Sequence, residues 1–291
     1  MGNISSRSMR QEFKSIVPAF PEGKEIPKVI YQTFRTKDLP PSCRENVSRI
    51  QAMNPDWQYQ LYDDVDIREF ITSNYDDRIL HYFNKINPVY GAARADFFRY
   101  LLIYKMGGVY LDIKSTTDLP LDEVINKYDS FLLSHWCNGP AQKFEGWGLH
   151  GDLLHIDGGE FQQWFIASAP GHPFLKAVIE NVIANIDRYN PALHGTGRRG
   201  VLRLTGPVAY TLAIFPLLAS NKYRYVNSEV DLGLRYTIFS GESHFELFKS
   251  HYSELKEPVV VIGVGTRMLA FAIKAFKKVQ GYLAGILRRH G

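Results

Sequence analysis

The sequence predicts an α/β domain in which a mixed, mostly parallel sheet is flanked by helices, with a basic amphipathic helix at the carboxyl end. Three observations lead to this prediction. Short β-branched and aromatic runs alternate with segments of helical periodicity. A helix that ends at two consecutive glycines leads directly into a strand with an acidic residue near its end. After Glu257 the chain has six basic residues and no acidic one.

The first elements follow from short local patterns. Residues 28–34 form a β-branched and aromatic run after a proline, which predicts a buried strand. Residues 54–62 begin with turn residues and continue with alternating apolar side chains, which predicts a second strand. Residues 63–74 begin with acidic residues, which the helix dipole favours, so we expect a helix there.

The most informative stretch lies between residues 88 and 115. Apolar residues recur at helical spacing over 90–106, which predicts a helix with one buried face. Gly107 and Gly108 end this helix, and residues 109–113 then form a strand with Asp112 near its carboxyl end. In open α/β sheets ligands bind at that end of the strands.

Later patterns complete one domain. We expect further strands at 130–134 and 259–264 and helices at 173–189 and 207–220. We therefore expect an amino-terminal arm at residues 1–25, one α/β domain at residues 26–262 and a terminal helix at residues 263–291.

Composition excludes several classes of protein. The chain has 291 residues, of which 45% are hydrophobic and 22% charged, as in ordinary globular proteins. Of the 34 Lys and Arg residues, six follow Glu257, which leaves 28 against 30 acidic residues elsewhere. A body with this balance and no basic stripe is not expected to bind nucleic acid.

Cys43 and Cys137 lie far apart without a metal-ligand spacing, which favours a reducing compartment. We expect no signal peptide and no transmembrane helix.

Three charged residues of the 90–106 helix point to chemistry. Arg94, Asp96 and Arg99 lie within one and a half turns, and the strand that follows carries Asp112. A carboxylate can bind ribose hydroxyls, and a guanidinium can hold phosphate oxygens in a fork. The alternative for these residues alone is a solvated ion pair on a helix face.

The whole string resembles a known family. Residues 93–100 (Ala-Arg-Ala-Asp-Phe-Phe-Arg-Tyr) and 107–112 (Gly-Gly-Val-Tyr-Leu-Asp) closely resemble the sugar-binding region of glycosyltransferase family 32. Residues 26–34, 161–174 and 205–207 resemble other blocks of that family in the same order, so the resemblance spans roughly residues 26–210.

The resemblance implies a GT-A type nucleotide-sugar-binding fold and a retaining transfer of a hexose. The donor would be a UDP- or GDP-sugar, and the acceptor a hydroxyl of a glycan or lipid-linked molecule. It assigns donor-binding positions and, more weakly, acceptor positions to particular residues of this chain. The donor positions are Tyr31, Gln32, Phe34 (an aromatic that stacks on the base in related toxins), Arg94, Asp96, Arg99 and Asp112, and the acceptor positions are Gln162, Gln163 and Trp164.

The chain departs from the family at one decisive position. Relatives end this strand with Asp-x-Asp, whose last carboxylate binds Mn²⁺ or Mg²⁺, but this chain has Asp112-Ile-Lys114. An ammonium group is a poor ligand for a hard cation. In one interpretation Asp112 and Lys114 are catalytic, and Lys114 neutralises the departing diphosphate in place of the metal. If a metal is used, Asp112 and His251 would hold it.

Two alternatives to this enzyme stay open on the sequence. The chain could be a non-catalytic nucleotide-sugar-binding or scaffold protein with a degenerate motif. It could also be a toxin-like enzyme that modifies protein side chains, which would share the donor site and differ in the acceptor.

Both ends of the chain suggest a membrane. From Thr266 onward apolar residues recur every three or four positions and basic residues occupy the opposite side, as in helices that lie on an anionic membrane surface. The alternative is a terminal helix packed on the body. Residues 1–6 (Met-Gly-Asn-Ile-Ser-Ser) also fit the N-myristoylation pattern. We therefore expect a peripheral membrane protein on the cytoplasmic side.

Overall fold

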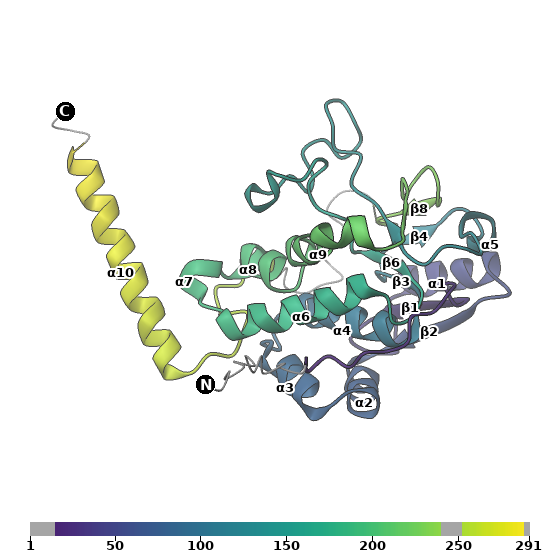
Figure 1. Ribbon diagram of the computed structural model, residues 1–291, viewed down its shortest axis with the longest axis horizontal. Helices are drawn as coiled ribbons and strands as arrows, with labels where there is room; N and C mark the ends of the chain where they lie inside the picture. The colour runs from purple at the N-terminus through teal and green to yellow at the C-terminus, as the bar shows by residue number, and fades with distance from the viewer. Residues whose placement is uncertain (1–14, 240–251, 288–291) are drawn as a thin grey trace, which may run out of the picture.

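A computed structural model describes residues 15–239 and 252–287 of the chain. Its main sheet has four strands in the order β2 (Gln58–Tyr62), β1 (Val29–Thr33), β3 (Gly108–Leu111) and β6 (Phe165–Ser168). β1 is parallel to both β2 and β3, whereas β6 is antiparallel to β3. The prediction of a mixed, mostly parallel sheet is thus confirmed, and Figure 1 shows helices around this sheet.

The remaining elements surround the main sheet. Two small sheets pair β4 (Thr116–Thr117) with β8 (Leu234–Arg235), and β5 (Leu132–Leu133) with β7 (Arg224–Tyr225). The α-helices are α1 (Pro41–Met53), α2 (Asp64–Asn74), α3 (Asp77–Lys85), α4 (Gly91–Met106), α5 (Leu121–Val124), α6 (Pro173–Arg188), α7 (Pro191–His194), α8 (Gly197–Leu204), α9 (Pro207–Ile214) and α10 (Val264–Leu287). Short 3₁₀ helices are η1 (Gly151–Leu153), η2 (Phe215–Ser220) and η4 (Tyr252–Glu254).

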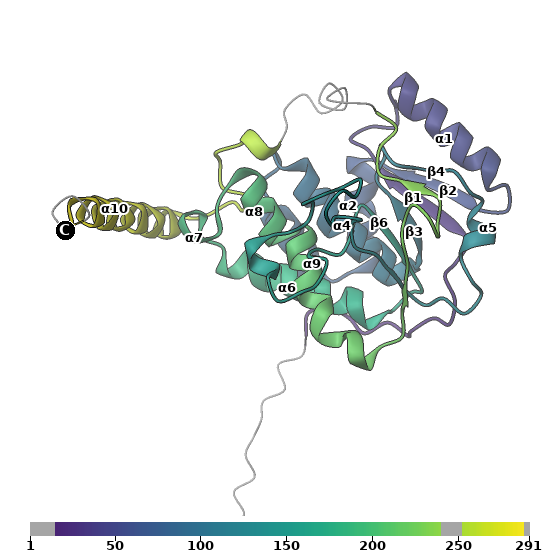
Figure 2. The same ribbon diagram turned by 90° about the horizontal axis from the view of Figure 1, so that it is seen from above.

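Each face of the main sheet builds its own core. Successive side chains of a strand point to opposite faces. Accordingly, Tyr31 and Tyr110 pack into the large cluster with α4 and α6, whereas Ile30 and Val109 belong to a second cluster. Figure 2 shows α1 and α5 on one side of the sheet and α4, α6 and α9 toward the other. Burial on both faces explains why β3 is continuously apolar.

Helix α4 is the central helix of the fold. The sequence predicted this helix correctly but with one buried face, and here the prediction is wrong. All eight residues from Phe97 to Tyr104 are buried, because α2, α3, α6, α8 and the sheet all pack against the helix. The run Phe-Phe-Arg-Tyr-Leu-Leu-Ile-Tyr therefore supplies core on every side, and the one charged residue within it, Arg99, is buried with it.

Two sequence predictions of secondary structure need correction. Residues 259–264 do not form a strand: Val260 makes a single antiparallel bridge to Ile86, and Val264 already begins α10. The predicted helix 207–220 changes to the 3₁₀ form after Ile214. Val259 and Val260 pack in the large core cluster, whereas Val261 and Val264 are 58% and 73% exposed, so the apolar run does not belong to a buried strand.

Part of the expected amino-terminal arm packs on the body. Val17 is buried in the large core cluster, and the hydroxyl of Tyr104 donates a hydrogen bond to the carbonyl of Pro18. The backbone N–H of Gly23 bonds to the carbonyl of Pro170. The myristoylation pattern at residues 1–6 lies outside the described residues.

Within the described residues one helical stretch, Gly197–Ser220, has the length and apolar composition to cross a membrane, and half of its most apolar window is buried inside the protein. It comprises α8, α9 and η2, of which α9 packs against α6, so it serves as part of the core. The terminal helix α10 instead extends away from the body (Figures 1 and 2).

The glycine at the end of α4 should be irreplaceable. Gly107 has φ 67°, and an added Cβ would lie 2.6 Å from Cδ of Pro170 and 2.8 Å from Cδ of Pro27. Strain and overlap together predict that Gly107→Ala lowers the free energy of unfolding by about 3 kcal/mol in urea denaturation. Gly91→Ala is the matched control: no atom lies within 4 Å of its added Cβ, and helix propensity predicts up to about 1 kcal/mol of stabilisation. Equal effects of the two variants would contradict the prediction.

A buried histidine should make the fold sensitive to acid. His172 caps α6 by accepting a hydrogen bond from the N–H of Phe174 at Nδ1, and burial lowers its pKa from 6.5 to about 4. The folded state therefore favours the neutral ring. The contribution of this ring to the free energy of unfolding is complete above pH 6.5 and is lost as the pH falls toward 4.

From this shift, the His172 ring should contribute a loss of about 2.5 kcal/mol between pH 7.5 and 4.5. His172→Asn keeps a capping acceptor without a titrating ring. We expect urea titrations at both pH values to show a smaller acid loss for the variant by about this amount, and an unchanged loss would refute the assignment.

Candidate active site

The end of β3 fixes the backbone of Asp112. Its N–H donates to the carbonyl of Trp164 at 2.8 Å, and its own carbonyl accepts from Gln32 Nε2 at 3.1 Å and from Ser115 Oγ at 2.7 Å. These bonds join β1, β3 and β6 at the carboxyl end of β3. The carboxylate of Asp112 is thereby held at the sheet edge, with 23% of its side chain exposed.

Arg99 of α4 links this carboxylate to a second one. Its Nη2 lies 3.0 Å from Asp112 Oδ1 and 3.2 Å from Asp96 Oδ1. Its Nη1 donates to the backbone carbonyl and the side-chain oxygen of Gln163, at 2.8 and 2.9 Å. The guanidinium also lies 4.5 Å from the ring centre of Tyr110. With 5% of its side chain exposed, Arg99 is an internal cation held by two carboxylates.

Asp96 is buried more deeply than Asp112. Its carboxylate accepts from Gln163 Nε2 and from Thr205 Oγ1, each at 3.1 Å, besides its contact with Arg99. Burial raises the pKa of Asp96 above its usual value, although these partners favour the charged form. Burial also opposes the charge of Arg99, but Asp112 and Asp96 outweigh it and raise the pKa of Arg99.

Lys114 lies two residues beyond Asp112 and contacts a tyrosine from far along the chain. Its Nζ donates to the hydroxyl of Tyr236 at 2.6 Å and lies 3.9 Å from the centre of that ring. The Tyr236 ring is in turn surrounded by the rings of Trp136, Trp147 and Trp164, at centroid distances of 5.1, 6.0 and 5.6 Å. The aromatic cluster thus fixes the hydroxyl that orients the ammonium group.

Of the predicted residues of β1 and its following loop, Gln32 contacts the site. It is completely buried and joins Asp112 to Tyr59, whose hydroxyl donates to Gln32 Oε1 at 2.9 Å. Tyr31 points to the face opposite Gln32, the same face as Tyr110, but it packs beside Tyr62 in the large core cluster. Phe34 is 7% exposed, in a small cluster with Leu39 and Ile113.

The structure does not bring Arg94 to Asp112. Its Nε and Nη2 donate to the carbonyl of Ile86, at 3.1 and 2.9 Å, and its guanidinium lies over the ring of Phe83. Positions 94 and 96 point about 200° apart on a helix, so the two side chains of this short motif leave α4 in different directions. Arg94 therefore binds the carboxyl end of α3, whereas Asp96 and Arg99 face the sheet edge.

The predicted acceptor residues lie at the start of β6. Gln163 is bound within the Asp96–Arg99 network. Gln162 and Trp164 are each 4% exposed, and Gln162 Oε1 and Trp164 Nε1 are buried without a hydrogen-bond partner. Buried polar atoms without partners are uncommon and are often found at functional sites. The indole N–H of Trp164 is thus an unused donor beside Tyr236.

The side chains at the carboxyl end of β3 are not suited to coordinate Mn²⁺ or Mg²⁺. Asp112 already pairs with Arg99, and the position of the second carboxylate holds the ammonium group of Lys114. Across residues 15–239 and 252–287, no three His, Cys, Asp or Glu side chains gather as a metal site. The other predicted metal ligand, His251, lies outside the described residues.

Sequence reasoning missed residues that join the site through tertiary contacts. Tyr236 is 122 positions from Lys114, and its surrounding sequence gave no signal. Thr205 belongs to one of the blocks that resemble the family, which was the available signal for its contact with Asp96. Tyr110 lies within the strand motif and reads as core, although its ring carries the Arg99 guanidinium.

Part of the chain is similar to glycosyltransferases of known activity. Residues 40–131 match the model of the family described as "Glycosyltransferase sugar-binding region containing DXD motif". The chain is 29% identical to inositol phosphoceramide mannosyltransferase 3 of Schizosaccharomyces pombe over 55% of its own length and 38% of that protein's. It is 27% identical to the initiation-specific alpha-1,6-mannosyltransferase of Candida albicans, over 72% and 57% of the two chains.

The fold is also similar to solved glycosyltransferase domains. The PaToxG glycosyltransferase superposes with a TM-score of 0.50 at 16% identity, over 85% of this chain and 84% of that one. The ligand-free glycosyltransferase domain of the YGT toxin gives a TM-score of 0.50 at 8% identity, over 86% and 90%. The chain spans less than half the length of its first curated relatives. The chain thus combines a GT-A glycosyltransferase fold with a segment, residues 40–131, that resembles the sugar-binding region of that family.

Proposed function

We propose that this protein transfers a hexose, with retention of anomeric configuration, from a UDP- or GDP-sugar to a hydroxyl of a glycan or lipid-linked acceptor. The observation that carries the proposal is the buried network of Asp96, Arg99 and Asp112 at the carboxyl end of β3. Fixed charges at this end of a sheet are suited to a ligand with several hydroxyls and a diphosphate. The names of the relatives make a mannose nucleotide the first donor to test.

The network prepares the site before the donor arrives. Arg99 holds both carboxylates, while Gln163, just before β6, and Thr205, the C-cap of α8, fix Asp96. Little reorganisation is then needed when a sugar replaces solvent at the exposed part of Asp112. Such preorganisation would hold the donor sugar in one orientation at little further cost, which lowers the barrier to transfer.

Lys114 is proposed to stabilise the departing nucleotide diphosphate. An ammonium group has three N–H donors, and Tyr236 uses one of them at 2.6 Å. Two donors remain for phosphate oxygens, in the position where relatives carry the carboxylate that binds the metal. A fixed cation beside the developing negative charge performs the electrostatic part of the reaction without Mn²⁺.

An assay of donor turnover separates this enzyme from a non-catalytic binding protein. A panel of radiolabelled UDP- and GDP-hexoses is incubated with the protein, alone and with neutral glycan, lipid-linked and protein acceptors. Release or transfer of a hexose from at least one donor supports the proposal, and transfer to protein alone would favour the toxin-like alternative. Donor binding by calorimetry without any release or transfer would instead identify a scaffold.

The role of Lys114 predicts an unusual metal dependence. We expect the wild-type protein to retain its activity in EDTA, and Lys114→Ala to lower kcat about a hundredfold because a transition-state cation is lost. Lys114→Asp restores Asp-x-Asp and should gain activity on addition of Mn²⁺.

Tyr236→Phe is the milder control for Lys114, since it keeps the ring under the ammonium and removes only the hydrogen bond, for a loss of about tenfold or less. Strict Mn²⁺ dependence of the wild-type enzyme, or full activity of Lys114→Ala, would refute the role.

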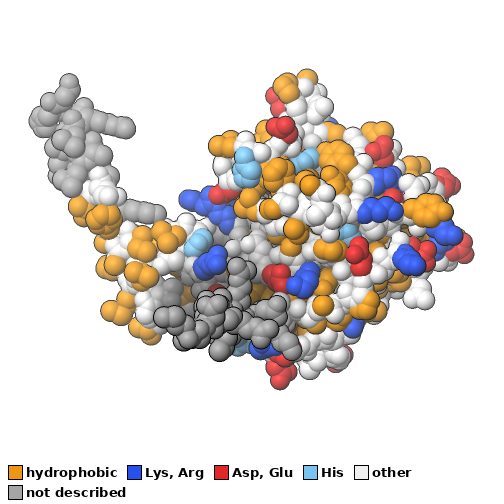
Figure 3. Space-filling model, viewed as in Figure 1, with side chains coloured by type: hydrophobic (Ala, Val, Ile, Leu, Met, Phe, Trp, Pro, Cys, Tyr) orange, Lys and Arg blue, Asp and Glu red, His pale blue; other side chains and the backbone are white. Residues whose placement is uncertain are grey.

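We further propose that α10 binds an anionic membrane surface, on the cytoplasmic side. Large apolar side chains on one side of the helix are exposed, including Met268 at 68%, Phe276 at 63% and Val279 at 55%. Figure 3 shows such side chains gathered on the projecting helix. Arg267 and Lys278 lie on the opposite arc, and each basic residue near anionic lipid adds about 1 kcal/mol. This pattern fits a helix lying flat in the interface.

Vesicle binding tests the membrane proposal. Phe276→Glu/Val279→Glu should weaken co-sedimentation with phosphatidylserine-containing vesicles more than tenfold, because each buried apolar side chain contributes roughly 1.5–3 kcal/mol. Leu154→Glu/Val230→Glu is the matched control, since both side chains are highly exposed on the body, at 89% and 76%. Wild-type sedimentation no greater than that of the α10 variant, or a lipid-independent dimer that the α10 variant abolishes, would contradict the proposal.

A further inference from the structure

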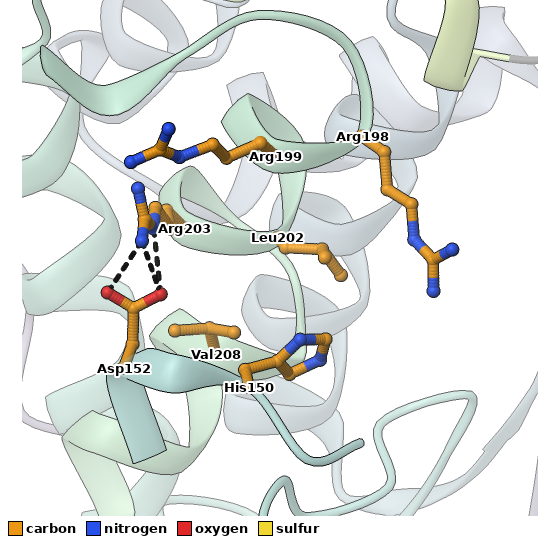
Figure 4. Close-up of a pocket in the computed structure, with 7 residues that line it drawn as sticks. All are labelled: His150, Asp152, Arg198, Arg199, Leu202, Arg203 and Val208. Atoms are coloured by element: carbon orange, nitrogen blue, oxygen red, sulfur yellow. Dashed lines mark hydrogen bonds and ion pairs between the residues drawn. The ribbon is translucent and has the colours of Figure 1, made fainter. Parts of the chain in front are cut away.

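A second basic site lies apart from the donor network, in a cavity of about 330 Å³ between α8, the start of α9 and η1. A cavity of this size falls within the range of small-molecule sites. Figure 4 shows its lining side chains, and the side chains of α8 dominate. The lining residues are His150, Asp152, Arg198, Arg199, Leu202, Arg203 and Val208.

The charges of this cavity are not balanced. Three arginines face one aspartate, which gives a net charge of +2 with a neutral histidine. Arg203 and Asp152 form a bidentate pair, with Nε–Oδ2 and Nη2–Oδ1 distances of 2.8 Å. Over the described parts of the chain, Arg198 and Arg199 form no ion pair with a carboxylate. Both are exposed, so two positive charges remain available to a ligand.

The position of these arginines on α8 needs a compensating partner. Arg198 and Arg199 occupy the first turn of the helix, where the helix dipole disfavours cations. Figure 4 shows the guanidinium groups of Arg199 and Arg203 side by side, with Arg198 extending from the other side of the helix. An anion within the cavity would interact favourably with the amino end of the helix dipole. It would also reduce the repulsion between the neighbouring guanidinium groups.

The neighbouring groups are already fixed for such a ligand. Asp152 holds the Arg203 guanidinium in one orientation. His150 Nε2 lies 2.7 Å from Glu160 Oε2, and Glu160 Oε1 accepts from Trp136 Nε1 at 2.7 Å. Glu160 therefore orients His150 from behind the cavity wall.

From these observations we propose that the cavity binds a phosphate ester. The planar guanidinium fork matches two phosphate oxygens. Arg199 supplies such a fork beside the guanidinium of Arg203, and Arg198 adds a second positive charge from the other side of the helix. Leu202 and Val208 provide an apolar floor for the rest of the ligand. The site differs from the donor network, although α8 connects them: Thr205, which bonds to Asp96, follows Arg199 by six residues, about 9 Å along a helix axis.

Two sources present this chemistry, a soluble phosphate ester and a phospholipid headgroup. Binding is measured without any nucleotide-sugar, so the result does not depend on hexose transfer. The soluble arm titrates inorganic phosphate and glycerophosphoinositol by calorimetry. The lipid arm measures co-sedimentation with phosphatidylcholine vesicles with and without phosphatidylinositol. Saturable soluble binding without enhancement by phosphatidylinositol identifies a soluble ester. An enhancement by phosphatidylinositol that Arg198→Gln/Arg199→Gln removes, and that Phe276→Glu/Val279→Glu keeps, identifies the headgroup.

Arg198→Gln/Arg199→Gln should weaken this binding at least about tenfold, since each variant side chain removes a charged hydrogen-bond donor. Arg68→Gln/Arg188→Gln is the matched control, with the same charge change at two exposed arginines of α2 and α6. Thermal melting confirms that both doubles stay folded.

Three outcomes would overturn the proposal: no saturable binding in either arm, equal losses in the two double variants, or an equal loss in Lys114→Ala. The last would assign the phosphate to the donor network instead of this cavity.

Discussion

The buried guanidinium of Arg99, held between Asp96 and Asp112, is the interaction on which the rest of the site depends. A charge taken out of water costs several kcal/mol unless its partners satisfy it. Arg99 meets this condition with two carboxylates, the Gln163 side chain and the ring of Tyr110. Because these partners come from α4, β3 and β6, the charge network also sets how the three elements meet.

This network connects stability with chemistry. Removing one member would leave a buried charge without a partner. The free-energy penalty of that unpaired charge is far larger than the net stabilisation that the intact ion pair provides. Thr205 extends the network to the end of α8, and Gln32 extends it to β1. The partly exposed carboxylate of Asp112 is therefore held in place by buried side chains. This arrangement is expected for a group that must meet a ligand in one orientation.

Lysine at position 114 changes the electrostatics of the sheet edge. A second carboxylate there would add a negative charge and need a cation for compensation, whereas Lys114 adds a positive one. The Tyr236 hydroxyl and the surrounding tryptophan rings orient this ammonium group. In the proposed mechanism this lysine supplies the cation for the diphosphate, in place of a metal bound by Asp-x-Asp.

By itself the sequence determined the α/β class, α4, the turn at Gly107 and the strand that ends beside Asp112, because propensity, helical periodicity and glycine geometry act locally. It also brought Asp96 and Arg99 together, since i,i+3 neighbours share a helix face. Only the tertiary structure decided that Arg94 turns toward α3, that Tyr236 orients Lys114 and that α8 forms a basic cavity. These contacts depend on the packing of distant segments, and a local pattern carries no information about which distant side chain will face it.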